Sequence, residues 1–150
     1  MRGAIPTLAL AIALVALTAA AFDPQGADVI GLRLGMPEAE VVAALGRQGF
    51  AAARDHDALV ARTRDGTLTI GLIDGRVGEI RYEFQGRGTG EADKIATSIL
   101  DRFGSPNQAN PMGWCRANGS DGKCPPQAAS LIFFPETLTL VLRAGTRVPR

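Results

Sequence analysis

The chain contains few of the side chains on which most metal sites and enzymes depend. Its 150 residues include one histidine, His56, together with one tryptophan, one tyrosine and two cysteines. A single histidine excludes a metal site built from several histidines, and it leaves one candidate base to activate a serine or cysteine nucleophile. His56 lies between two aspartates in a charged segment, which is typical of a surface loop. We therefore expect no metal, no cofactor and no enzymatic activity.

The chain also has no excess of charge of either sign. It carries 16 basic and 15 acidic side chains, which gives a formal net charge of +1 at pH 7. Nucleic acids are bound through concentrated positive charge, so this balance argues against a nucleic-acid partner. The one group of basic residues lies near the end of the chain, at Arg143, Arg147 and Arg150. We interpret residues 144–150 as a flexible, solvated tail.

A third absence concerns apolar runs long enough to cross a membrane. Residues 4–18 form an almost continuous apolar run of about 15 residues, whereas a spanning helix needs about 20. The run follows the basic start Met1-Arg2 and leads into the small residues Ala19-Ala20-Ala21. This pattern is typical of a secretory signal peptide. It predicts that residues 1–21 are removed by cleavage after Ala21, rather than kept as an anchor, and that the mature protein is periplasmic or secreted.

The positions of the two cysteines agree with export. No cysteine stands at the predicted cleavage site, so we expect neither a bacterial lipid anchor nor any stable membrane anchor after cleavage. Cys115 and Cys124 lie nine positions apart in a segment rich in glycine, asparagine and proline. In an oxidising compartment this spacing predicts a disulfide. Closing a ring of that size stabilises a fold by about 2.5–3 kcal/mol when it is worked from loop entropy.

Hydrophobic patterning predicts a strand and then a helix in the first part of the mature chain. Alternating apolar residues indicate a short strand at 29–34. Pro37 suits a first helical turn, and the apolar stripe that includes Val41 and Leu45 predicts a helix over 37–48. Gly49 should end this helix in a left-handed conformation.

An antiparallel meander should follow, because three strand-like runs are separated by short turn sequences. The dipeptides Asp65-Gly66 and Asp74-Gly75 are both typical of two-residue type I′ hairpin turns. Along each run one face is apolar and the other polar, which indicates an antiparallel sheet with one buried face. The three strands are expected at 59–64, 67–73 and 76–84.

The second half of the chain repeats this order of elements. A second amphipathic helix is predicted at 91–103, ended by Gly104, and a long loop at 105–129 with a short strand near 112–116. A last strand pair is expected at 130–134 and 137–143. The predicted fold is a single α+β domain over residues 22–143, with two amphipathic helices packed on one face of an antiparallel meander. The recurring order is that of two helix-plus-strands repeats sharing one sheet.

The start of the first helix resembles a family of small bacterial envelope domains. The run Leu34–Val41 (LGMPEAEV), with Leu45 beyond it, is similar to the helix-opening motif of the SmpA/OmlA (BamE)-like envelope lipoproteins and of the β-lactamase-inhibitor-like fold. The order of elements is similar over residues 30–84. Two features depart from the family pattern: Pro37 replaces the capping serine or threonine, and the lipid-bearing cysteine is absent. The resemblance implies a non-enzymatic envelope domain that acts through protein–protein contact.

Trp114 and Met112 are the candidate interaction residues. Trp114 directly precedes Cys115, so a disulfide would hold this large amphipathic side chain on a stiffened loop, and such aromatics recur as interface anchors. The alternative is that Trp114 fills the core beneath the loop, as most large aromatics do. We expect a protein–protein interaction module whose partner is another envelope protein. The second hypothesis is a periplasmic binding protein that holds a small apolar ligand in a cavity between the sheet and the helices.

Overall fold

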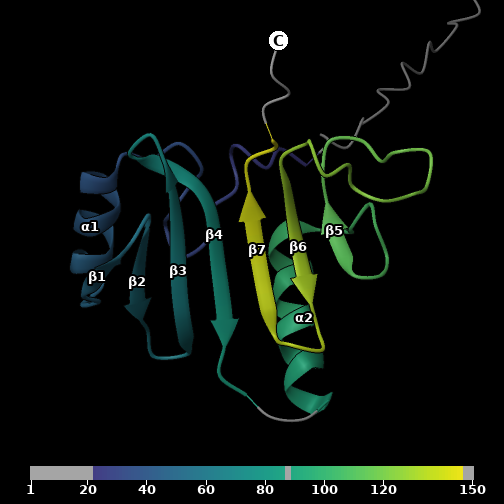
Figure 1. The fold of residues 1–150 in the computed structure, drawn as a ribbon. Coiled ribbons are helices and arrows are strands. Elements are labelled where there is room, and N and C mark those ends of the chain that lie inside the picture. Colours follow the sequence, from purple (N-terminus) through teal and green to yellow (C-terminus); the bar gives the residue numbers. More distant parts are fainter. Residues whose placement is uncertain (1–21, 87–88, 147–150) are drawn as a thin grey trace, which may run out of the picture.

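The computed structural model describes residues 22–86 and 89–146 (Figure 1). The predicted signal peptide, residues 1–21, lies outside the described residues. In the described part, two helices and a seven-stranded antiparallel sheet form an α+β fold, which confirms the predicted class. In chain order the elements are α1 (Glu38–Arg47), β1 (Ala52–Asp55), β2 (Ala58–Arg62), β3 (Gly66–Ile73), β4 (Arg76–Phe84), α2 (Thr89–Phe103), β5 (Met112–Trp114), β6 (Ser130–Phe134) and β7 (Thr139–Arg143).

The sheet joins two meanders at its centre. The strand order is β1-β2-β3-β4-β7-β6-β5, and β4 pairs antiparallel with β7. Each meander follows its own helix in the chain, and the last strand of each meets the other in the middle of the sheet (Figure 1). This arrangement is the one predicted for two helix-plus-strands units that share one sheet.

One face of the sheet carries the core. A register-aligned row crosses six of the strands, and each of its side chains is at most 3% exposed. Val41 and Leu45 of α1 and Ile99 of α2 belong to the same buried cluster, so both helices pack on this face, as predicted. The row consists of Leu59, Ile70, Ile80, Leu142, Leu131 and Trp114.

Glycines end both helices as the sequence predicts. Gly49 has a φ of 81°, and the Phe50 N–H donates to the Leu45 carbonyl over 2.9 Å. Gly104 has a φ of 77°, and its N–H donates to the Leu100 carbonyl over 2.8 Å. These bonds satisfy carbonyls that the last helical turn leaves without partners.

One of the two predicted hairpin turns is confirmed and the other is wrong. Asp74 and Gly75 have φ values of 52° and 73°, as a type I′ turn requires. Gly66 instead lies inside β3, opposite Phe84, and the turn forms at the residues before it. A Cβ atom at Gly66 would collide with the Glu83 carbonyl oxygen and lie 2.8 Å from the Tyr82 ring. This glycine therefore allows the close approach of two strands rather than a turn.

The strand predicted at 29–34 is also wrong. Ile30 and Gly31 have φ values of 52° and 75° and form a tight turn between Val29 and Leu32, which exchange two backbone hydrogen bonds of 2.9 and 3.0 Å. The Asp28 carboxylate accepts the Gly31 N–H over 2.9 Å and so stabilises the turn. The alternating apolar pattern arose because Val29, Leu32 and Leu34 are buried on either side of a turn rather than along a strand.

The charged segment around His56, which was predicted as a surface loop, is the end of an edge strand followed by a turn. Residues Ala52–Asp55 form the edge strand β1, and His56, with a φ of 53°, begins the turn into β2. Beyond the last strand, the Ala144 N–H donates to the Gly78 carbonyl over 2.8 Å, so the paired structure extends one residue into the predicted tail. Residues 147–150 of that tail lie outside the described residues.

Candidate functional site

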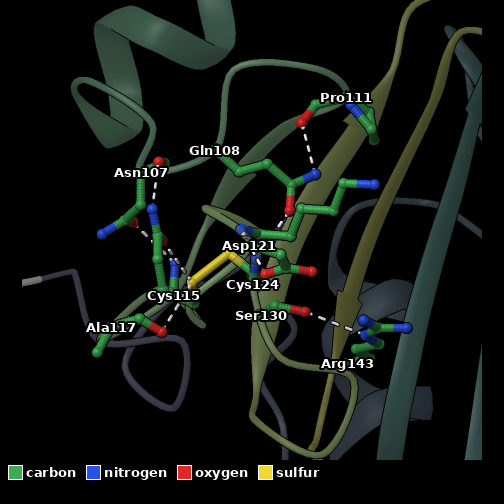
Figure 2. Close-up of a disulfide and its surroundings, with 11 residues drawn as sticks. Asn107, Gln108, Pro111, Cys115, Ala117, Asp121, Cys124, Ser130 and Arg143 are labelled. Carbon is green, nitrogen blue, oxygen red and sulfur yellow. Dashed lines mark hydrogen bonds between the residues drawn. A yellow bond between two sulfur atoms is a disulfide. The ribbon is translucent and has the colours of Figure 1, made fainter.

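The loop between α2 and β6 is closed by the predicted disulfide. Cys115 and Cys124 are bonded, with their Cα atoms 5.8 Å apart, and no cysteine of the described chain is free (Figure 2). The Cys115 N–H donates to Asn107 Oδ1 over 3.0 Å, and the Cys124 N–H donates to Gln108 Oε1 over 2.8 Å. Gln108 Nε2 in turn donates to the Pro111 carbonyl over 2.8 Å. These bonds tie both ends of the disulfide ring to the residues that follow α2.

Trp114 lies in the core rather than on the surface of this loop. Its side chain has no exposed surface, and its indole N–H donates to the Gly104 carbonyl at the end of α2 over 2.9 Å. The ring centroid of Phe103 lies 6.3 Å from that of Trp114. Met112 is partly buried on the same face of the sheet, opposite Phe133. The structure therefore agrees with the core interpretation of Trp114, and the two candidate residues do not form an exposed patch.

A groove lies between α2 and the sheet, and aromatic and aliphatic side chains make up much of its lining. It has a volume of about 390 Å³, and we call it the α2 groove. Its floor is formed by Tyr82 and Phe84 of β4 and by Leu140 of β7, and the turn at residues 28–30 forms one wall. The opposite wall is the inward side of α2, which contributes the apolar side chains Ile95, Ile99 and Phe103.

The floor of the groove is aromatic and neutral. The rings of Tyr82 and Phe84 lie with centroids 4.4 Å apart, and the Tyr82 hydroxyl is 2.8 Å from Thr63 Oγ1. Burial raises the pKa of Tyr82 above its usual value of 10.0, the hydrogen bond to Thr63 lowers it, and the carboxylate of Asp65 raises it again. The net change is upward, so the phenol stays protonated at physiological pH and the floor carries no charge.

Charged side chains line the rim of the groove. Arg102 of α2 donates to the Asp28 carboxylate over 2.6 Å and ties the helix to the turn at 28–30. This hydrogen bond lowers the pKa of Asp28, partial burial opposes the change, and the Gly31 N–H adds to it. Lys94 pairs with Glu91 over 3.2 Å nearer the start of the helix. The site therefore combines an apolar floor with a polar rim.

A second hollow lies on the other side of the first half of α2. It has a volume of about 540 Å³ and is lined by Ala92 and Asp93 of α2 and by the turn between β6 and β7, residues 135–138. Phe84 lines both this hollow and the α2 groove. The apolar side chains in this half of the helix are consequently only partly buried, Ile95 and Ala96 among them.

His56 is on the surface, as its sequence context indicates. It stands at the turn between β1 and β2 with its side chain 94% exposed, and its Nδ1 atom lies 2.8 Å from the Asp55 carboxylate. Over residues 22–86 and 89–146, no group of three or more His, Cys, Asp or Glu side chains is arranged to hold a metal ion. In the same residues, no helix combines the length and apolar character that crossing a bilayer requires.

Sequence patterning did not identify the α2 groove, because its residues come from five separate parts of the chain. The turn at 28–30, the turn before β3, the end of β4, helix α2 and strand β7 meet there only after the two meanders pair. The apolar stripe of α2 was the one sequence feature that pointed to this groove. We expected the whole stripe to be buried in the core, whereas Ile95 and Phe103 are only partly buried and line the groove.

Comparisons of the chain with models of protein families, with curated proteins and with solved structures find no match. The resemblance of Leu34–Val41 to the SmpA/OmlA-like motif therefore stays a prediction. The candidate site rests on the geometry of this chain alone.

Proposed function

We propose that the mature chain is an exported, non-enzymatic binding domain, and that its α2 groove receives an apolar segment of another envelope protein. The observation that carries this proposal is the groove itself, with Tyr82, Phe84 and Ile95 at its centre and ion pairs at its rim. An apolar centre surrounded by a polar rim is the usual anatomy of a protein–protein interface. Trp114 supports the site from beneath by packing near Phe103.

An open groove favours a chain segment over an enclosed small ligand. The side chains at its rim are well exposed, Lys94 to 77% and Glu91 to 42%. Small-molecule sites bury about 70–90% of the ligand surface. A groove that is open along one side instead admits a segment that enters and leaves, while one or two of its side chains are buried.

Export is the second part of the proposal, and the disulfide supports it. Disulfides form and persist in oxidising compartments. The measurement is the intact mass of the protein recovered from the extracytoplasmic fraction of its own host. We expect a chain that begins at Phe22 and lacks two hydrogens because Cys115 and Cys124 are bonded. A full-length chain with two thiols, recovered from the cytosol, would contradict export.

Site-directed photo-crosslinking in the host cell tests the binding site. A benzophenone amino acid at Ser98 would point into the groove, whereas the same group at Thr97, one residue earlier and exposed, lines neither hollow. We expect a discrete protein adduct from position 98 that is absent at position 97 and is lost when Ile95→Gln is added. Equal adducts from both positions, or none from position 98, would refute the proposed site.

The alternative is a small apolar ligand in the same groove, and the volume favours it. About 390 Å³ is within the range of small-molecule sites, which runs from about 300 to 1,000 Å³. Native mass spectrometry of the protein purified from its host distinguishes the two hypotheses. A stoichiometric small-molecule adduct that Ile95→Gln abolishes would support the alternative.

A further inference from the structure

The charges of the described side chains that line the α2 groove and the second hollow are unbalanced. Two cationic side chains, Lys94 and Arg102, line the α2 groove, and both are already paired with carboxylates. The second hollow is lined by no cationic side chain among the described residues. Three carboxylates of the lining remain, and no ion pair with a described side chain neutralises them. They are Asp65 before β3, Asp93 on α2 and Glu136 in the turn between β6 and β7.

These three carboxylates belong to one end of the molecule. The turn before β3, the end of β4, the turn between β6 and β7 and the start of α2 all lie at the lower end of the sheet in Figure 1. Asp65 is close enough to the groove floor for its charge to raise the pKa of Tyr82. Arg64 is adjacent to Asp65 in the chain but does not line the groove. Among the residues that the structure describes, an apolar floor is thus bordered by carboxylates that have no ion pair.

We propose that the segment received by the α2 groove is cationic, with an apolar side chain flanked by lysine or arginine. This inference rests on the proposed function and specifies its partner. The apolar side chain packs on Tyr82 and Phe84, and the flanking cations face Asp65 on one side and Asp93 and Glu136 on the other. The rings contribute as well, because a cation within about 6 Å of an aromatic face is attracted to it.

The expected preference is moderate and depends on salt. Each ion pair at an exposed rim strengthens binding about 1.4- to 5-fold. Two flanking pairs should therefore strengthen binding about two- to thirtyfold over an uncharged segment at low ionic strength. Screening should remove most of the preference when the Debye length falls from about 20 Å to about 5 Å.

The test uses three fluorescein-labelled peptides with the same Leu-Phe-Leu core, flanked on each side by two lysines, two serines or two glutamates. Binding to the mature protein is measured by fluorescence anisotropy at low and high salt. The charge-neutralised variant combines Asp65→Asn, Asp93→Asn and Glu136→Gln. Its matched control neutralises three exposed carboxylates elsewhere, by Asp57→Asn, Asp74→Asn and Asp101→Asn. Emission from the single tryptophan verifies that each variant is folded.

The inference predicts that the lysine-flanked peptide binds tightest and loses its advantage in the charge-neutralised variant but not in the control. Equal binding of all three peptides, abolished by Ile95→Gln, would overturn the charge preference and leave the groove as the proposed site. Failure of all three peptides to bind would overturn both. A dimer of the chain that forms with concentration and is removed by Ile95→Gln would make a second copy the occupant, and would also overturn the inference.

Discussion

Trp114→Phe is the substitution whose effect can be worked out most fully from the structure. The change removes the indole N–H and leaves the Gly104 carbonyl without the donor that now lies 2.9 Å away. Losing that hydrogen bond costs about 1 kcal/mol. The smaller ring leaves a cavity at a position with no exposed surface, which adds about 1–2 kcal/mol. We expect the free energy of unfolding to fall by about 2–3 kcal/mol.

The assay is urea unfolding followed by far-ultraviolet circular dichroism, with the disulfide intact. The unfolding midpoint should fall while the slope with urea stays constant, since the native fold is unchanged. Val42→Ala serves as the control, because Val42 is 47% exposed on α1 and its truncation should cost under about 0.5 kcal/mol. If Trp114→Phe cost no more than Val42→Ala, the placement of Trp114 in the core would be refuted.

Three further predictions concern stability. Reducing the Cys115–Cys124 disulfide should lower the free energy of unfolding by about 2.5–3 kcal/mol, as measured by urea unfolding with and without reductant; an unchanged midpoint would contradict this. Asp28→Asn should destabilise the protein by less than about 1 kcal/mol at neutral pH. Arg102 lowers the pKa of Asp28 in the folded state. The contribution of Asp28 to the free energy of unfolding is therefore fully present above its usual pKa of 3.8, and it disappears as the pH falls through the lower folded pKa. A difference in stability between Asp28→Asn and the wild type that persisted below that pKa would refute the ion pair as its cause. Gly66→Ala should cost about 1–3 kcal/mol through its collision with β4, whereas Gly46→Ala, which meets no atom within 4 Å in α1, should be neutral or stabilising by up to about 1 kcal/mol. Equal thermal midpoints for these two glycine variants would contradict the steric argument.

The parts of the fold that could be predicted from the sequence are those determined by neighbouring residues. Gly49 and Gly104 end the two helices, and Asp74-Gly75 forms its turn, because each needs only local backbone geometry. Apolar periodicity located both helices and the strands β2, β3, β4, β6 and β7 in the same way.

The parts that could not be predicted depend on residues far apart in the chain. The role of Gly66 is apparent only once β4 lies against β3, because the clash that it avoids is with the backbone of Glu83. Strand β1 was not predicted, because its mostly exposed sequence, which includes Arg54 and Asp55, has no alternation of apolar and polar residues. The burial of Trp114 depends on the position of the end of α2, where the Gly104 carbonyl accepts the indole N–H.

The candidate site shows the same division. The disulfide was predictable from the spacing of two cysteines in a chain whose start resembles a signal peptide. The α2 groove was not, because Asp28, Tyr82, Ile95 and Leu140 lie up to 112 positions apart and meet only in the folded sheet. The partly buried apolar face of α2 links the fold to the proposed function, since it leaves a surface for a partner to cover.

The claim that the α2 groove binds an apolar segment is tested most directly by mapping the binding surface on the protein. The measurement is a titration of the ¹⁵N-labelled mature protein with the lysine-flanked Leu-Phe-Leu peptide, followed through amide chemical shifts. We predict that the largest shifts cluster at residues 28–30, at the end of β4 and along α2. Shifts confined to the opposite face of the sheet, for example at Val60, Thr69 and Val141, would contradict the account.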